Sequence, residues 1–145
     1  MQTINNIVTY LNSVATDHKQ INSFGFGDLW EIESTNALKG VAMWAVLRDA
    51  NLSGKVINIR FTILIMDLVN KDESNETEVI SDTFQVALDV FSLVDFIDNA
   101  DLFTIEKSST IEPFTERFDN EWAGLSMDLT FKLNFANAIC EVPTV

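Results

Sequence analysis

The clearest pattern in the chain is a run of alternating apolar residues from Lys55 to Val69. The positions that would face one side of an extended backbone are all apolar: Ile57, Ile59, Phe61, Ile63 and Ile65. The other side begins polar, with Asn58 and Arg60, and turns apolar from Leu64 onward. This pattern predicts a strand that is half exposed where it starts and buried on both faces where it ends.

A second alternation runs without error from Leu125 to Phe135. Its apolar members are Leu125, Met127, Leu129, Phe131, Leu133 and Phe135. Every residue between them is polar or charged, which predicts a strand with one face in the core and the other in water. Such one-sided strands favour antiparallel pairing over a parallel sheet that is covered on both faces.

Two segments have the helical spacing of apolar residues. The first predicts an amphipathic helix from about Ile4 to Asp17, and the second predicts a longer helix from about Glu76 to Asp98. The expected buried side of the longer helix is formed by Ile80, Phe84, Ala87, Leu88, Phe91 and Val94. Further apolar residues broaden this side: Val79, Val86, Val90, Leu93 and Phe96. The apolar surface is wider than one sheet contact needs, and burial against neighbouring subunits is one explanation.

Shorter strands are expected around these elements. A strand from Val41 to Leu47 and a turn from Arg48 to Gly54 would form a hairpin with the long strand. Another strand begins near Leu102 to Ile105, and a further arm runs from Ile111 to Asp119. This arm contains Pro113, which cannot donate a hydrogen bond to a neighbour, so we expect it at a sheet edge or in a bulge.

The sequence therefore predicts an α+β fold: a mainly antiparallel, twisted sheet with an N-terminal helix and a longer central helix packed on it. The length of 145 residues and the apolar fraction of 47% fit a single domain over residues 1–145 with a substantial core.

Charge and cysteine content exclude several classes of function. Nine basic residues stand against 22 acidic ones, a net charge of −13, and the basic residues form no cluster, so tight nucleic-acid binding is not expected. No apolar run approaches the roughly 20 residues that cross a bilayer, so no membrane partner is expected. With Cys140 as the single cysteine, no internal disulfide can form, and the first residues lack the features of a signal peptide. We expect folding in a reducing cytoplasm.

Candidate catalytic and metal-binding residues are sparse. His18 and Cys140 are the only His and Cys, and a surface histidine with a buried structural thiol explains them better than a nucleophile–base pair does. The glycines in Phe24 to Gly27 lack the remaining residues of a phosphate-binding loop, so a kinked or bulged strand is the simpler interpretation.

Two further alternatives concern metal ions and sugars. The acidic loop from Asp72 to Glu78 could hold Ca²⁺ or Mg²⁺, but it lacks the calcium-loop pattern and is typical of a solvated charge run. Trp30, Trp44 and Trp122 could line a sugar cleft, although tryptophans in strands more often belong to the core. We therefore expect no catalytic residues, no metal and no cofactor.

The chain resembles the tail-terminator or tail-completion proteins of tailed bacteriophages, including related neck and head–tail ring proteins. The resemblance is carried by ILIMDLV (Ile63 to Val69), NETEVISDTFQVALDVFSLV (Asn75 to Val94), FDNEWAGLSMDLTFKL (Phe118 to Leu133) and the end from Cys140 to Pro143. It implies a non-enzymatic virion protein, assembled in the host bacterial cytoplasm as a homo-oligomeric ring of six or twelve subunits. The implied partners are portal, adaptor and tail proteins, and DNA would pass through the ring.

A closed ring needs two different contact surfaces on each subunit. For one surface we expect the longer helix and the ends of the long strand, with these candidate residues: Met66, Leu68, Phe84, Phe91 and Phe96. For the other we expect the Arg48 to Lys55 turn and the Ile111 to Asp119 arm, with these candidates: Arg48, Asn51, Lys55, Phe114 and Phe118. The alternatives are a monomeric phage or bacterial adaptor protein and a small-ligand or sugar-binding domain.

Overall fold

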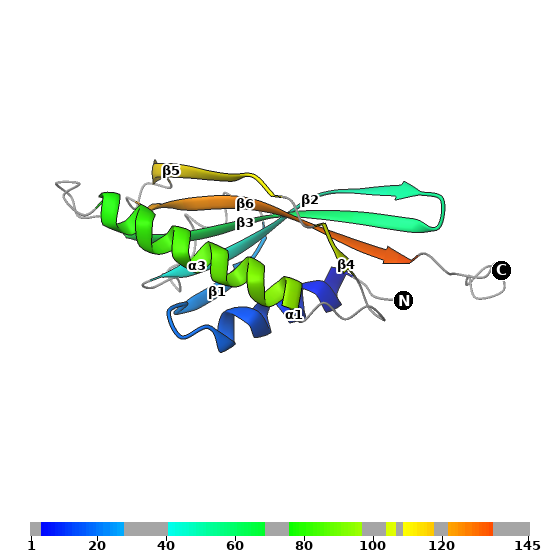
Figure 1. Ribbon diagram of the computed structural model, residues 1–145, viewed down its shortest axis with the longest axis horizontal. Coiled ribbons are helices and arrows are strands. Elements are labelled where there is room, and N and C mark those ends of the chain that lie inside the picture. Colours follow the sequence, from blue (N-terminus) through cyan, green and yellow to red (C-terminus); the bar gives the residue numbers. More distant parts are fainter. Residues whose placement is uncertain are drawn as a thin grey trace.

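The computed structural model confirms the α+β class, with two helices on a curled, mixed sheet of six strands (Figure 1). It describes residues 4–27, 41–68, 76–96, 104–106, 109–117 and 122–134. Several predictions lie outside these residues: the acidic loop up to residue 75, and Trp30, Phe118, Phe135 and Cys140. The last part of that predicted loop, from Glu76 to Glu78, belongs to the longer helix.

Four strands in the order β1-β2-β3-β6 form the body of the sheet, and β4 and β5 both pair with β6. The strands are β1 (Ser23–Phe26), β2 (Ala42–Ser53), β3 (Val56–Leu68), β4 (Thr104–Ile105), β5 (Ile111–Arg117) and β6 (Trp122–Asn134). All pairs are antiparallel except β1 with β2, which is parallel. The prediction of a mainly antiparallel sheet is therefore confirmed, with β1 as the exception.

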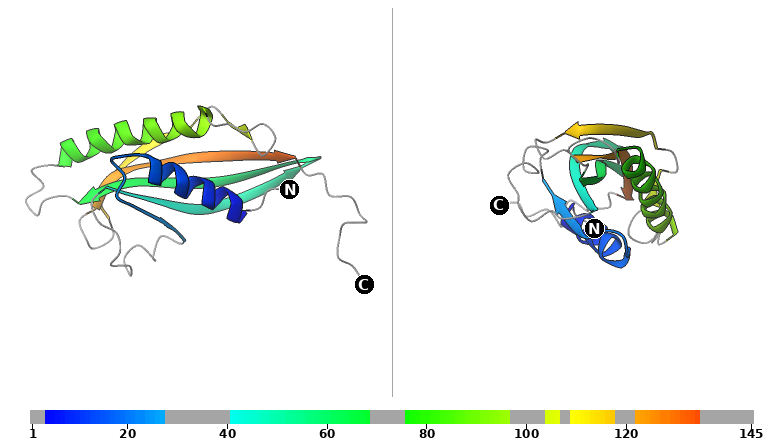
Figure 2. Two further views of the ribbon diagram at one scale, coloured as in Figure 1. Left: turned by 90° about the horizontal axis from the view of Figure 1, so that it is seen from below. Right: turned by 90° about the vertical axis from the view of Figure 1, so that its left-hand side faces the viewer.

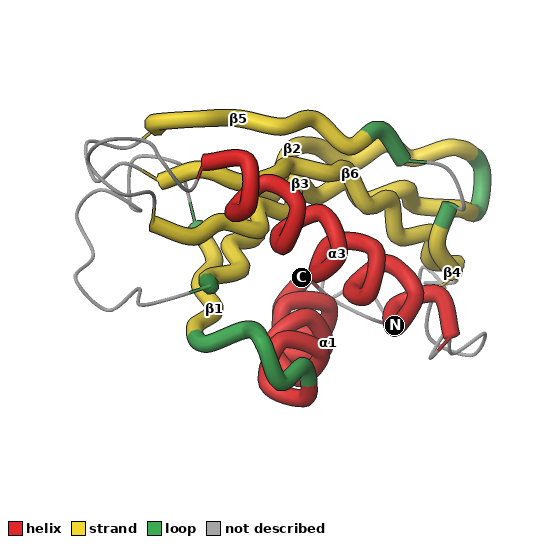
Figure 3. The backbone as a smooth tube through the Cα atoms, turned by 60° about the vertical axis from the view of Figure 1, so that its left-hand side comes forward, coloured by secondary structure: helices red, strands yellow, loops and turns green. Residues whose placement is uncertain are grey.

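The two helices lie on the same face of the sheet (Figure 3). They are α1 (Ile4–Asp17) and α3 (Glu76–Phe96), so both predicted helices are confirmed to within about two residues. On α1 the buried residues are Ile7, Leu11, Val14 and Ala15, as the spacing predicts. α1 packs towards β1, while α3 crosses β6 and β3. The main core lies between the helices and this face of the sheet.

The buried side of α3 differs from the predicted one. Its fully buried apolar residues are Val79, Val86, Ala87, Val90 and Val94. Phe84 and Leu88, predicted to be buried, are 44% and 39% exposed. The prediction was wrong because α3 is apolar around most of its circumference. Spacing alone therefore does not decide which side of α3 faces the sheet. In the structure the smaller side chains, the valines and Ala87, pack against the sheet.

Both long strands have the predicted faces. The residues of β3 from Ile59 to Ile65 on the helix side and those of β6 from Leu125 to Leu133 belong to the main core. The opposite face of β3 is exposed at Arg60 and buried at Leu64 and Met66, as predicted. Its buried end packs in a second cluster with Ala42, Trp44, Val46, Phe114 and Trp122. Trp44 and Trp122 are thus core residues, which agrees with the simpler interpretation of these tryptophans.

The predicted turn from Arg48 to Gly54 is mostly strand. β2 continues to Ser53, which pairs with Val56, so the turn contains only Gly54 and Lys55. Gly54 has a φ of 60°, which the favoured two-residue hairpin turns require at this position. The far half of the hairpin, which includes the second half of β2, extends past both helices, so its side chains lie in water (Figure 2). Its sequence is therefore mostly polar and resembles that of a loop.

Two local predictions on the edge strands are confirmed. Phe24 and Gly25 lie in β1 and pair with Met43 and Trp44, so the glycine pattern belongs to a strand and not to a phosphate loop. The ring of Trp44 covers Gly25 so closely that a Cβ atom there would overlap it. Pro113 lies in β5, which pairs only with β6 among the described strands and has an irregular register after Phe114.

Candidate functional site

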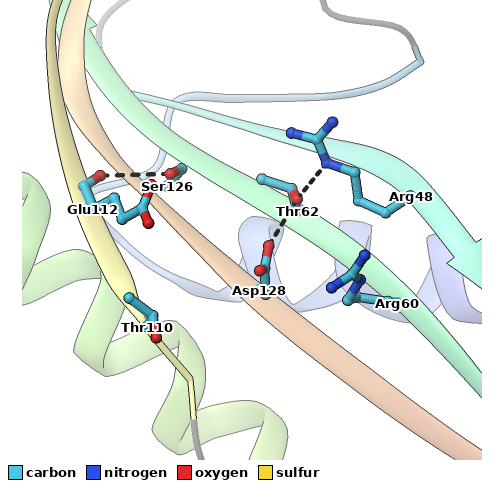
Figure 4. A pocket seen from close by; sticks show the side chains of 7 residues that line it. All are labelled: Arg48, Arg60, Thr62, Thr110, Glu112, Ser126 and Asp128. Carbon is cyan, nitrogen blue, oxygen red and sulfur yellow. Dashed lines mark hydrogen bonds between the residues drawn. The ribbon is translucent and has the colours of Figure 1, made fainter.

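A chain of polar side chains crosses the sheet face that points away from the helices. The Arg48 Nε–H donates to Thr62 Oγ1 at 2.7 Å, and the Thr62 hydroxyl donates to Asp128 Oδ1 at 2.8 Å (Figure 4). Thr62 is 5% exposed, so its hydroxyl needs both partners. One buried hydroxyl therefore links a cation on β2 to an anion on β6.

A bulge in β2 positions Arg48. The register shifts between Leu47, which pairs with Phe61, and Asp49, which pairs with Arg60. The extra residue lets two consecutive side chains reach the same face of the sheet. Arg48 contacts Thr62 there, while Asp49 accepts a hydrogen bond from Arg60 Nη2 at 2.6 Å. Both partners of the Arg60–Asp49 ion pair are about half exposed, so it adds little to stability.

Shallow hollows lie along this polar face. One of about 310 Å³ is lined by Arg48, Arg60, Thr62, Thr110, Glu112, Ser126 and Asp128 (Figure 4). Another of about 420 Å³ is lined by Asp49, Asn51, Asn58, Arg60, Glu106, Thr130 and Lys132. Each mixes cations with carboxylates, and neither has an aromatic side chain in its lining. The sugar site considered from the sequence needs carboxylates beside a tryptophan, and these hollows do not provide that arrangement.

His18 is not the surface residue that the sequence led us to expect. Its side chain is 10% exposed at the end of α1, and its Nε2 lies 3.0 Å from Asp89 Oδ2 on α3. Its Nδ1 accepts a hydrogen bond from the backbone N–H of Gln20 at 3.1 Å. With Nδ1 an acceptor, Nε2 is the ring nitrogen that can donate to the Asp89 carboxylate. Both ring nitrogens are engaged, so neither faces a nucleophile.

The His18–Asp89 contact should tie the two helices together. We expect His18→Ala and Asp89→Ala each to lower the free energy of unfolding. The coupling free energy between the two substitutions should be about 0.5–1 kcal/mol, because the Asp89 side chain is half-buried. Urea unfolding of both single variants and the double variant measures this coupling. Asp82→Ala is a suitable control because Asp82 is exposed on the same helix and forms no ion pair within the described part of the chain. Strictly additive effects of the two substitutions would contradict the expected link.

An apolar stripe runs along α3 outside the core. Its members recur at helical spacing and are Ile80, Phe84, Leu88 and Phe91. Phe84 and Leu88 are exposed, while Ile80 and Phe91 are half-buried at its border with the core. This set is called the α3 stripe below. Phe84 and Leu88 are therefore two neighbouring apolar side chains of α3 that are in part exposed to water.

A second exposed surface lies on the far half of the β2–β3 hairpin. Leu47 and Leu52 are 38% and 60% exposed, and they pair with residues that face the helix side of the sheet. Arg48 is also exposed in this stretch, but it reaches Thr62 on the opposite face of the sheet. Leu47 and Leu52 are called the hairpin patch below. Leu47 and Leu52 were not among the named contact candidates, although Leu52 lies within the Arg48 to Lys55 turn that was predicted as a contact surface.

The structure separates the predicted interface candidates into three groups. The side chains of Arg48, Asn51, Lys55 and Phe84 are exposed, and that of Phe91 is half-buried. Met66 and Phe114 are wrong as interface residues because they are 0% and 6% exposed in the second cluster of the core. The positions of the Leu68, Phe96 and Phe118 side chains lie outside the described part.

Neither the family models nor the curated proteins include a match to this chain. Neither α1 nor α3 is long and apolar enough to cross a membrane. Within the described residues, no three His, Cys, Asp or Glu side chains gather into a possible metal site.

Proposed function

We propose that this chain is a non-enzymatic structural protein of a virion. It forms a homo-oligomeric ring of six or twelve subunits in the head–tail connector or tail, as a tail terminator or completion protein. DNA passes through the ring, and portal, adaptor and tail proteins contact it on either side. Assembly takes place in the cytoplasm of the host bacterium.

The observation that carries this proposal is the presence of two different uncovered surfaces on one subunit. The α3 stripe is on a helix, and the hairpin patch is on strands that extend beyond both helices (Figure 2). A cyclic ring is built from head-to-tail contacts, in which each subunit offers two unlike surfaces. The net charge of −13 further supports a ring that lets DNA pass without holding it.

Light scattering over a concentration series, combined with electron-microscope images, tests this function. We expect a mass of six or twelve subunits and closed particles with a central hole. A monomer at every concentration, without closed particles, would favour the alternative of an adaptor that acts as a monomer. The polar hollows on the sheet give no comparable support to a sugar-binding function, because their linings lack aromatic side chains.

The α3 stripe should be needed for assembly but not for folding. We expect Phe84→Ser with Leu88→Ser to weaken self-association at least tenfold, because each change removes about 1 kcal/mol of apolar burial from the contact. Sedimentation velocity at several concentrations measures the effect. Gln85→Ser, on the polar side of the same helix, is the matched control and should assemble normally.

The thermal unfolding midpoint separates assembly from folding in this experiment. Below the concentration at which the wild-type protein associates, the double variant should unfold within a few degrees of the Gln85→Ser variant, because both sets of side chains are already exposed. Normal assembly of the double variant would show that the stripe is not a subunit contact.

A further inference from the structure

We infer that the open edge of β2, from Leu47 to Ser53, pairs with the same edge of a second copy of this chain. The two strands run antiparallel around a two-fold axis at Ala50 and join the sheets of both copies. This contact goes beyond the head-to-tail contacts of the proposed ring, because a two-fold axis joins two rings of six and does not enlarge one ring.

β2 is paired on both sides along only part of its length. It pairs with β1 from Ala42 to Ala45, but from Val46 to Ser53 it pairs only with β3 among the described strands. The far half of β2 lies along one margin of the hairpin, on the side away from both helices (Figure 1). All seven residues from Leu47 to Ser53 are exposed. They form an edge about 24 Å long, because a strand rises about 3.4 Å per residue.

The backbone groups of this edge can accept another strand. The Ala45 carbonyl accepts a hydrogen bond from the Gly27 N–H on the β1 side, so the backbone groups of Ala45 point away from β3. In an antiparallel pair this direction alternates from residue to residue. Leu47, Ala50 and Leu52 pair with every second residue of β3 counted from the partner of Ala45. Their backbone groups therefore also point to the open edge, where they form a template for a strand.

The other outer strands of the described sheet offer no equal match to this edge. β1 and β4 contain four and two residues, which is too short for a pair of this length. β5 is longer, but its Pro113 has no N–H to donate to a neighbour. β2 contains no proline, so the best match to its edge in a second copy is the same edge.

The side chains along the edge match their own reversed order. The bulge sets Arg48 and Asp49 opposite one residue of β3, so the edge alternates regularly when these two count as one position. Reversing the order about Ala50 sets Leu47 of each copy opposite Leu52 of the other. The bulged pair of one copy then meets an uncharged residue of the other. No charged side chain lies directly opposite a like charge, which would be destabilising.

The two leucine pairs fix the register of the contact. Cross-strand neighbours in an antiparallel pair lie close enough for their side chains to touch, so the flanks of Leu47 and Leu52 leave water on both copies. A shift by one residue would set both leucines against polar residues. The added strand lies beside the leucines in the plane of the sheet, so their helix-side surfaces stay open to a neighbour in the ring.

Proline at the centre of the edge tests the contact. We expect Ala50→Pro to halve the mass of the assembled protein, from twelve subunits to six or from two to one. Proline removes the central N–H and its ring fills the edge, but no hydrogen bond to β3 is lost because this N–H points outward. Ala50→Val is the matched control, since valine keeps the N–H and should leave the mass unchanged. Light scattering measures the masses, and circular dichroism checks that both variants fold.

Charged substitutions at the two leucines test the register. Leu47→Lys with Leu52→Glu sets opposite charges against each other at both ends of the pair, whereas Leu47→Lys with Leu52→Lys sets like charges there. Both leucines are exposed, so both double variants should fold. We expect the first variant to pair about tenfold or more tightly than the second, because charges directly opposite each other attract or repel across the strands. Sedimentation velocity at several concentrations measures the difference.

The results separate this contact from the ring. A wild-type assembly of six or twelve subunits whose mass is unchanged by Ala50→Pro would overturn the edge contact and leave the ring. A wild-type dimer that Ala50→Pro converts into a monomer would support the edge contact and overturn the ring. Equal pairing by the two charged variants would overturn the register centred on Ala50. A wild-type monomer at every concentration would overturn the ring and the edge contact together.

Discussion

Replacing Phe131 with aspartate should abolish folding. Phe131 lies in the C-terminal part of β6, is 0% exposed and belongs to the main core. Its ring meets that of Phe61 edge to face, with centroids 5.7 Å apart. Truncating such a side chain costs about 3–5 kcal/mol by itself, and an unpaired buried carboxylate adds several more. The sum is comparable to the whole free energy of unfolding of an ordinary domain.

Thermal or urea unfolding monitored by circular dichroism tests this expectation. The variant should show no cooperative transition and should aggregate on expression. Lys132→Asp is the matched control because it places the same side chain one residue further along, on the exposed face of β6. That control should fold. If Phe131→Asp unfolded at the wild-type midpoint, the assignment of the faces of β6 would be wrong.

Adding a single methyl group at Gly124 should destabilise the protein strongly. Gly124 lies in β6, where it pairs with Met66 on one side and with Phe114 on the other. A Cβ atom on Gly124 would overlap the carbonyl oxygen of Ile65 and lie 2.7 Å from the Cα of Met66. These are backbone atoms of β3, so no side-chain rotation can relieve the contact.

We expect Gly124→Ala to lower the free energy of unfolding by about 3 kcal/mol, at the upper end of the range for overpacked cores, because two paired strands must move apart. Urea unfolding measures the loss. Ser126→Ala is the matched control, since it lies two residues further along the same face and removes only a hydroxyl with a long contact of 3.5 Å to the Glu112 carbonyl. Equal stability of the two variants would contradict the close approach of β3 and β6.

Several elements could be predicted from local pattern because their two sides have different environments. β6 alternates without error since one of its faces is in the core and the other in water. The bounds of α1 follow from an apolar stripe whose members Ile7, Leu11 and Val14 are all buried. In each case the sequence period and the burial agree, so the element and its inward face could be predicted together.

The candidate site could be predicted only in part. Arg48 and Lys55 were identified because a turn residue is exposed whatever lies around it, and both are exposed in the hairpin. Met66 and Phe114 were misassigned because the second cluster of the core draws on β2, β3, β5 and β6, and no local spacing shows that these strands meet. His18 and Asp89 are 71 positions apart in the chain, and no local sequence motif indicates a contact between them.

The sequence by itself determined the α+β class, both helices, the two long strands with their faces, and the edge position of the strand with Pro113. These features follow from periodicity and from backbone chemistry, which act within a few residues. Only the tertiary structure decided which side of α3 is buried, that β1 pairs parallel to β2, and that the bulge at Arg48 aims it at Thr62. The physical reason is that these features depend on the shape of a neighbouring surface. Where the apolar side of a helix is wider than its contact with the sheet, as in α3, that shape selects the valines for the core and leaves Phe84 and Leu88 exposed.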